Sequence, residues 1–336
     1  MITVPAYDSV LTVFADYKRS IGFDVEVVTT NIIGKKRTEI KQYIQSQYDN
    51  LATRPKYVLL VGDTDAIPPF EGTPSGKDKN KPISDLGYAL LEGNDLFADV
   101  GIGRFSVANT KDLQNIIDKT IFMETNMHLI EKKAKFIAGD EAKGVWNRAY
   151  MKSSFKKGHK YVVPHVFIPL GYDCEKLYAP DKTAVMNALS DNPVFFLYAG
   201  HGVFTHFAGK SFTFESADIA LASNTVFPFV FAFACKTGNF AYPISIGEHW
   251  LRAKDKGAVT YFGASVNSQT NTDPIIEKRI FEEILKQDAQ SISEMINLGM
   301  KRFAKAAGVT KKKKEIYLKA YNLLGDPSLK VEGLKD

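Results

Sequence analysis

Residues 194–202 (VFFLYAGHG) place His201 directly after an apolar run. Residues 226–240 repeat this arrangement, because the apolar run that ends at Phe233 is followed by ACKTGNF, which contains Cys235. Short apolar runs that are bounded by turn residues are typical of strands buried in a parallel sheet. The two segments therefore predict two core strands, each with one chemically able side chain at its carboxyl end.

The separation of the two side chains favours neighbouring strands. His201 and Cys235 lie 34 positions apart, with a predicted helix at 217–222 between them, and parallel neighbours need a crossover of about this length. A histidine and a thiol at one rim of a sheet suit a cysteine nucleophile with a histidine partner. The backbone amides of Gly202 and Cys235 are the predicted donors to the oxyanion.

Outward from these strands, helices and strands alternate along the chain. Helical spacing of apolar residues covers 8–21 and 37–48, and apolar strand patterns cover 23–28 and 57–61. A second round of strands opens at 135–139. The alternation predicts an α/β fold with a mostly parallel sheet and helices on both faces. We expect two adjacent subdomains, an N-terminal one over 1–127 and a C-terminal one over 128–336 that carries the histidine and the cysteine.

Some local patterns lead to further expectations. Residues 88–91 and 162–168 have the composition of short extended segments, and the second of these is rich in valine. Cys174, in the stretch GYDC, is expected in a loop, where it packs rather than reacts.

The bulk composition excludes several classes of protein. The formal charge of +5, from 43 basic and 38 acidic residues, is too small to indicate nucleic-acid binding. Two cysteines form no metal-binding cluster, so we expect no metal, and no apolar stretch reaches membrane-spanning length. The amino terminus lacks the pattern of a signal peptide. This favours a cytoplasmic protein; the alternative is a secreted protein whose leader precedes residue 1.

Several short motifs, taken in order, give the chain a family resemblance. The sequence resembles the gingipain family of cysteine endopeptidases, whose fold is similar to that of caspases. The resemblance implies a caspase-like three-layer α/β/α fold and protein or peptide substrates. The matching segments are YVLLVGD at 57–63, residues 84–105, YAGHG at 198–202, ACKTGNF at 234–240, GAS at 263–265 and LGDPSL at 324–329.

The resemblance also implies roles for individual residues. Cys235 is the expected nucleophile and His201 the general base and acid, with the amides of Gly202 and Cys235 as the oxyanion hole. The family has an acidic residue that orients the histidine, and Glu141 in IAGDEA falls at the corresponding place. Asp140 is one position away and is the substitute candidate. A carboxylate there would hold the tautomer of the imidazole and stabilise its protonated form.

The specificity determinants of the family do not carry over. Gingipains that cut after Arg or Lys have an acid in the specificity pocket, but the corresponding stretch here offers Arg148 and Lys152. Their charge favours an acidic substrate side chain. Asp273 is the only acid in the segment after GAS, and the family's pocket tryptophan is missing there. His206, close to the histidine turn, is a further candidate for the substrate cleft.

Two readings compete with a thiol endopeptidase. One is a catalytically silent or partner-regulated binding module on the same fold, and the other is a hydrolase with the same dyad that acts on a non-peptide acyl group. We expect no cofactor. Gingipains can bind calcium, but no complete calcium-ligand string is present in this sequence, so a structural calcium ion remains open.

Overall fold

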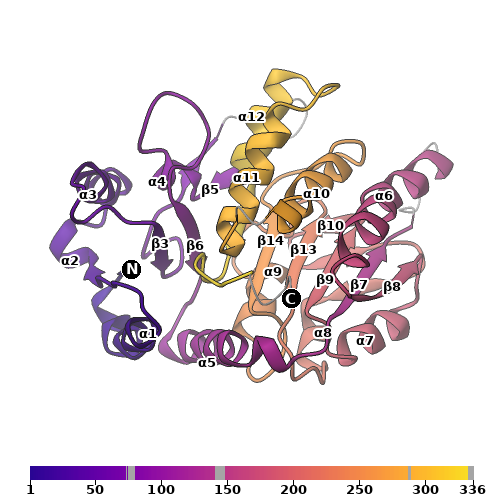
Figure 1. The fold of residues 1–336 in the computed structure, drawn as a ribbon, viewed down its shortest axis with the longest axis horizontal. Helices are drawn as coiled ribbons and strands as arrows, with labels where there is room; N and C mark the ends of the chain where they lie inside the picture. The colour runs from indigo at the N-terminus through magenta and orange to yellow at the C-terminus, as the bar shows by residue number, and fades with distance from the viewer. Residues whose placement is uncertain (73, 75–79, 141–147, 287–288, 332–336) are drawn as a thin grey trace.

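The computed structural model describes residues 1–72, 74, 80–140, 148–286 and 289–331 (Figure 1). These residues form a ten-stranded sheet in the order β2-β1-β3-β6-β15-β14-β13-β9-β7-β8. Its strands are β1 Ile2–Thr3, β2 Val28–Thr29, β3 Tyr57–Val61, β6 Gly101–Phe105, β7 Lys133–Ala138, β8 Asp173–Tyr178, β9 Phe195–Ala199, β13 Phe229–Phe233, β14 Thr260–Ala264 and β15 Tyr321–Leu324.

One pair of neighbours reverses the direction of the sheet. Strand β15 is antiparallel to β14 and parallel to β6, and every other neighbouring pair is parallel. The strands on the β6 side therefore run opposite to those on the β14 side. As a result, the edge at which β9, β13 and β14 end is the edge at which β3 and β6 begin.

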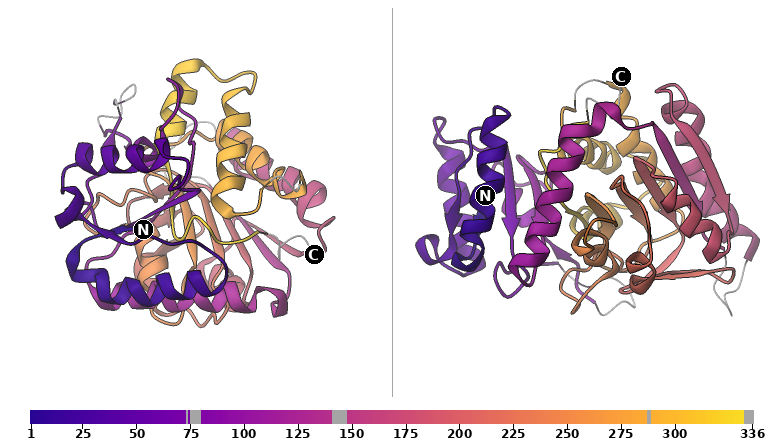
Figure 2. Two further views of the ribbon diagram at one scale, coloured as in Figure 1. Left: turned by 60° about the vertical axis from the view of Figure 1, so that its left-hand side comes forward. Right: turned by 90° about the horizontal axis from the view of Figure 1, so that it is seen from below.

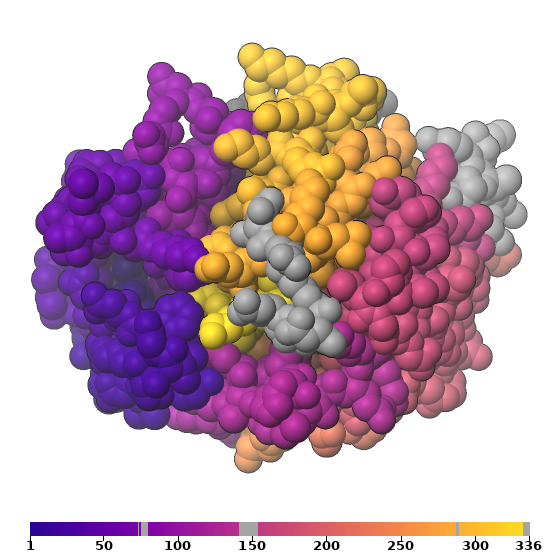
Figure 3. Space-filling model, in the orientation of Figure 1, coloured from indigo at the N-terminus to yellow at the C-terminus, as the bar shows by residue number. Residues whose placement is uncertain are grey.

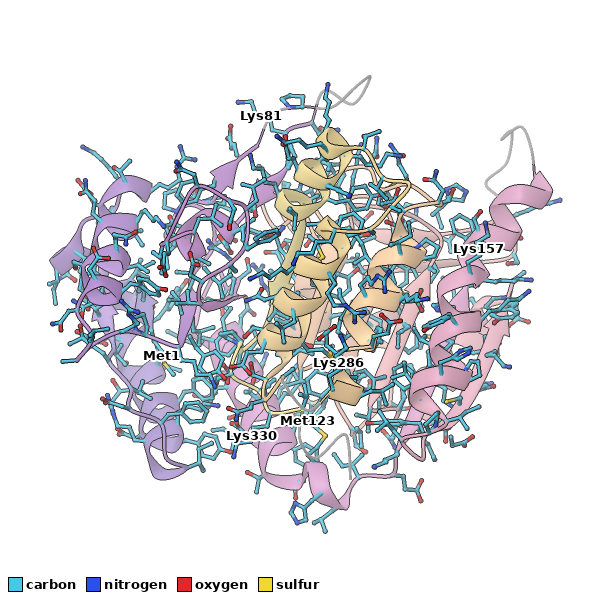
Figure 4. The ribbon with its side chains drawn as sticks, turned by 45° about the horizontal axis from the view of Figure 1, so that its top comes forward. Met1, Lys81, Met123, Lys157, Lys286 and Lys330 are labelled. Atoms are coloured by element: carbon cyan, nitrogen blue, oxygen red, sulfur yellow. The ribbon has the colours of Figure 1, made fainter. Side chains whose placement is uncertain are left out.

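Helices cover both faces of this sheet (Figures 1 and 2). One face is covered by α3 Arg37–Asp49, α4 Leu86–Ala89, α6 Arg148–Val162, α10 Asp273–Phe281, α11 Ile292–Ala304 and α12 Lys311–Ala320. The other is covered by α1 Asp8–Ser20, α5 Thr110–Asn126, α7 Lys182–Ser190, α8 Ser216–Ala220 and α9 Ile246–Arg252. In the side-chain view, sticks fill the layer between these helices and the sheet (Figure 4).

The side chains of β9 and β13 explain the two layers of core. In β13, Phe229, Phe231 and Phe233 face the α6–α10 side, whereas Val230 and Ala232 face the α9 side. All five residues of each strand are buried, which accounts for their continuous apolar sequence. Full burial of one large apolar side chain contributes about 1.5–3 kcal/mol. The predicted three-layer, mostly parallel fold is confirmed.

The two predicted subdomains meet within one sheet. β15, from the C-terminal part of the chain, lies between β6 and β14, and helix α5 connects the halves (Figure 2). The division at residues 127 and 128 stays a prediction.

Four local expectations are wrong. Of the strand expected over 23–28, only Val28 lies in a strand, the first residue of β2. Residues 88–91 belong in part to helix α4, where Tyr88 packs edge-on against Phe70. Residues 162–168 continue helix α6 through a π-helical turn at Val163–Phe167, which accommodates Pro164 without ending the helix. Cys174 lies in strand β8 rather than in a loop. In the valine-rich segment, burial of one helical face outweighed the strand preference of the β-branched residues.

Several smaller elements lie outside the ten-stranded sheet. They are α2 Thr30–Ile33, β4 Phe70–Glu71, β5 Ile83–Ser84, β10 His201–Val203, β11 His206–Ala208 and β12 Thr213–Glu215. A cavity of about 610 Å³, lined among others by Lys18, Tyr43, Tyr57 and Asp326, opens between the segments near the N-terminus (Figure 3). In the described part of the chain, no helix combines the length and apolarity that crossing a membrane requires.

Candidate active site

Strands β9 and β13 bring the predicted histidine and cysteine to one edge of the sheet. They are parallel neighbours, and Ala199 pairs with Phe233. His201 and Cys235 each follow two residues beyond that pair, so they leave the sheet at the same level. We call this edge the His–Cys edge. His201 begins strand β10, the first strand of a small antiparallel sheet formed by β10, β11 and β12.

Gly202 shows how closely the two segments approach. A Cβ atom added to Gly202 would lie 2.9 Å from the Cys235 carbonyl oxygen and 2.6 Å from Cγ2 of Thr237. Any other residue would push the two segments apart, because real Cβ contacts of this length hardly occur. Glycine therefore lets the histidine strand lie directly against the cysteine turn.

The turn that carries Cys235 is held by the segment that follows β14. The amide of Lys236 donates to the Val266 carbonyl at 3.0 Å, and the amide of Gly238 donates to that of Ala264 at 2.9 Å. The Asn239 side-chain amide donates to the Ser265 carbonyl at 2.8 Å. Lys236 itself adopts a φ of 61°, a left-handed conformation that is rare for a residue with a side chain. Backbone strain of this kind is common at functional sites.

The Cys235 thiol points toward the loop before α10. Its Sγ donates to the Ser268 carbonyl at 3.6 Å. Burial raises the pKa of the Cys235 thiol, because the thiolate loses hydration, and the Ser268 contact and the Lys236 ammonium oppose this increase only in part. Burial therefore favours the neutral thiol over the thiolate.

His201 is half-buried beside the thiol turn. Its ring meets Phe155 of α6 edge-on, with 5.2 Å between ring centroids. Its Nε2 atom is buried and has no hydrogen-bond partner among the described residues. Burial lowers the pKa of His201, and the Asp140 carboxylate partly offsets that effect. The imidazole is therefore neutral, and its free nitrogen can accept a proton.

The two candidates for the orienting acid have different outcomes. Glu141 lies outside the described residues, so its role stays a prediction. The Asp140 carboxylate accepts hydrogen bonds from the amides of Lys210, at 2.5 Å, and Ser211, at 3.1 and 3.2 Å. Asp140 thus holds the turn after β11 and acts on His201 only through its charge.

Asp273 is buried beneath the loop before α10, which contains Ser268. Its carboxyl group accepts hydrogen bonds from Ser268 Oγ at 2.7 Å and from the Tyr321 hydroxyl at 2.9 Å. Burial raises the pKa of Asp273 to about 7. Asp273 as a whole is 5% exposed in this conformation, so contact with a substrate requires the loop to open.

The remaining candidates are only partly placed. Arg148 and Lys152 lie in helix α6, but their side chains are outside the description. His206 lies on β11, opposite Val203 of β10, with its Nδ1 atom 3.2 Å from Thr205 Oγ1. Cys174, in β8, is far along the sheet from Cys235, and burial raises the pKa of its thiol to about 11.

Sequence reasoning missed three residues that shape this site. Phe155 contacts the imidazole, Ser268 accepts the thiol hydrogen, and the Tyr198 hydroxyl donates to the His201 carbonyl at 2.7 Å. Phe155 and Ser268 are distant from the two motifs in sequence, so only the fold brings them in. Tyr198 is within the YAGHG motif, but its position in an apolar strand made it indistinguishable from a core residue.

Comparisons with known proteins agree with this geometry. The model for peptidase family C25 matches residues 1–332. Gingipain R2 of Porphyromonas gingivalis is 30% identical over 350 residues, which is 99% of this chain and 46% of that protein. Lys-gingipain of the same organism is 30% identical over 270 residues, 76% of this chain and 15% of that protein. The chain thus spans less than half of the length of these relatives.

Solved structures support the fold. The crystal structure of the Arg-specific cysteine proteinase gingipain R superposes with a TM-score of 0.80 at 23% identity, and covers 98% of this chain and 77% of that chain. Another solved structure, described only as a protease, gives a TM-score of 0.84 at 24% identity, with 98% and 77% covered. Together with the match over residues 1–332, these findings show that the chain belongs to peptidase family C25, a family of gingipain-type cysteine peptidases.

Proposed function

We propose that this chain is a cysteine endopeptidase that cleaves peptide bonds through Cys235 and His201. The observation that carries the proposal is the parallel pairing of β9 and β13, which brings a histidine and a cysteine to one edge. Family membership adds to it, because the relatives named above are cysteine peptidases.

The neutral resting state of both side chains favours general-base catalysis. In the proposed reaction, the Cys235 thiol turns from Ser268 toward His201, and Nε2 removes its proton as sulfur attacks the scissile carbonyl. The sulfur–carbon bond forms, and the imidazolium then returns the proton to the leaving amine. Water hydrolyses the thioester and regenerates the thiol.

The backbone around the dyad suits the oxyanion. The Cys235 amide donates to no group in the described part of the chain, so it is free to bind an oxyanion. The Gly202 amide, on the adjacent segment, is the proposed second donor. Glu141 is the proposed orienting residue, and removal of its carboxylate would lower the basicity of His201.

We propose that specificity differs from cleavage after Arg or Lys. The acid available in the segment after GAS, Asp273, is enclosed by Ser268 and Tyr321 rather than exposed to substrate. Arg148 and Lys152 remain candidate contacts for an acidic side chain. His206 remains a candidate for lining the cleft.

Covalent labelling tests the proposed nucleophile. A peptidyl acyloxymethyl ketone is expected to label the native protein at Cys235 by forming a thioether with its sulfur. Cys235→Ala should abolish the labelling, because alanine has no sulfur atom to which the probe can bond. Cys174→Ala is the matched control and should label normally. A mass-spectrometric map of cleavage sites in a denatured proteome then gives the specificity. Complete absence of labelling and of cleavage would favour the silent binding module.

The pH dependence of alkylation tests the neutral resting state. Because the pKa of Cys235 is raised, the thiolate fraction and the iodoacetamide rate should increase about tenfold per pH unit up to pH 9. Because the pKa of His201 is lowered, no acidic plateau from an ion pair is expected. Cys174, with a pKa of about 11, should react more slowly. A constant rate between pH 5 and pH 7 would instead reveal a thiolate–imidazolium pair.

A further inference from the structure

An aromatic and cationic ledge adjoins the proposed nucleophile. Lys236 follows Cys235 directly, and its Nζ atom lies 5.4 Å from the centroid of the Phe204 ring. Phe204 in turn stacks on Tyr242, with centroids 4.3 Å apart and planes 6° apart. We call these three residues the Lys236 ledge.

The backbone fixes this ledge relative to the dyad. Phe204 is in the turn between β10, which begins at His201, and β11. Its carbonyl accepts a hydrogen bond from the Ile246 amide at 2.7 Å, at the start of α9. Lys236 is held by the bond from its own amide to Val266. The aromatic pair and the ammonium group are therefore placed by the same turns that place His201 and Cys235.

The ledge is open to solvent on its apolar side. Tyr242 is 38% exposed, Ile244 is 41% exposed, and Val203 is 38% exposed. Exposed apolar residues that cluster beside a reactive centre mark a binding surface more often than scattered ones do. An extended substrate can therefore bury apolar surface here as it reaches the dyad.

The Lys236 ammonium group carries a positive charge directly beside Cys235. Among the described residues it forms no ion pair, whereas the buried acids of the same region are satisfied by other groups. Asp140 binds the amides of Lys210 and Ser211, Asp273 binds Ser268 and Tyr321, and Glu248 binds Ser245 and Arg252. Within the described part of the chain, the charge next to Cys235 is therefore positive and forms no ion pair.

We propose that the Lys236 ledge is a substrate subsite that selects an acidic side chain close to the scissile bond. The substrate carboxylate pairs with the Lys236 ammonium, and its neighbouring apolar groups lie on Phe204 and Tyr242. The partly buried setting makes this pair stronger than one in open water. This inference rests on the proposed peptidase function and extends it to substrate choice.

Lys236 occupies a strained backbone position. A residue with a side chain at φ 61° costs stability, and glycine or asparagine would occupy this position more readily. The strain guides the choice of variants, because Lys236→Asn and Lys236→Gly remove the charge without adding strain.

The test compares peptides that carry Glu or Gln at each position from the third before to the third after the scissile bond. For the native protein, kcat/KM should be about tenfold higher for Glu at one or two positions, as expected for a charge-assisted hydrogen bond. Lys236→Asn and Lys236→Gly should reduce that ratio to about one, and Lys236→Glu should favour Lys over Gln instead. About 1 M salt should weaken the preference, because it screens the charges.

Matched controls separate the possible outcomes. Lys254→Glu makes the same charge change at the opposite edge of the sheet and should leave the Glu-to-Gln ratio unchanged. If Lys236 variants lower kcat/KM equally for Glu and Gln peptides, the ledge activates the thiol and the subsite proposal is overturned. Equal cleavage of both peptides by the native protein also overturns it. Failure of the proposed peptidase itself is distinct, since no peptide would be cleaved and no probe would label Cys235.

Discussion

Replacement of His201 by alanine or glutamine is expected to lower kcat/KM by about three to four orders of magnitude. The buried Nε2 atom has no other partner in the described structure, and neither replacement can accept the thiol proton at that place. General-base catalysis contributes about 10²–10⁴-fold, and the neutral Cys235 thiol depends on it fully. Steady-state kinetics on the best peptide found for the native protein measures the effect.

Two controls decide whether this loss is chemical. His128, exposed in the 3₁₀ turn Met127–Leu129, is the matched histidine, and His128→Ala should retain full activity. Thermal unfolding of His201→Gln should stay close to that of the native protein, because glutamine retains most of the ring's volume against Phe155. Activity of His201→Gln within tenfold of the native value would rule out the imidazole as the base.

The second large effect is expected at Arg104, whose replacement by methionine should destabilise the fold by about 3–5 kcal/mol. The guanidinium group is fully buried and binds both carboxylate oxygens of Asp85, each at 2.7 Å. It also donates to the carbonyls of Gly62 at 2.8 Å and Ile67 at 3.0 Å, and stacks over Phe240 of the cysteine turn at 4.7 Å. Methionine would leave the Asp85 charge buried without a partner. Urea unfolding measures the loss.

A double variant can distinguish the effect of the lost charge pair from the effect of lost packing. Adding Asp85→Leu to Arg104→Met removes the orphaned carboxylate and should recover part of the stability. Arg19, in an exposed ion pair with Asp16, is the matched control, and Arg19→Met should cost about 1 kcal/mol or less. A double variant as unstable as Arg104→Met alone would place the effect in the carbonyl contacts instead.

The sequence predicted the two strands of the candidate site better than the pairing of the rest of the sheet. Strands β9 and β13 were predicted because all their side chains are buried, which makes the sequence uniformly apolar. Their adjacency followed from the spacing of His201 and Cys235. The reversal at β15 was not predictable, because the pairing of Tyr261 with Leu324 joins residues far apart in the chain.

The candidate site likewise has one part that the sequence predicts and another that it does not. The two reactive side chains are marked by local motifs, but what surrounds them comes from distant segments. Asp273 is the example: its sequence neighbours suggest an exposed pocket acid, whereas Tyr321 closes over it from strand β15. Long-range contacts of this kind leave no trace in a single sequence.

The parallel run of β13 and β14 makes the molecule amenable to engineering. The turn at Lys254 and Asp255 precedes β14, so it lies at the end of that strand remote from Cys235, and both side chains are solvent-exposed. A fluorescent or affinity tag inserted there would be carried at the edge of the sheet opposite to the His–Cys edge. The protein could then be immobilised or imaged with its His–Cys edge unobstructed.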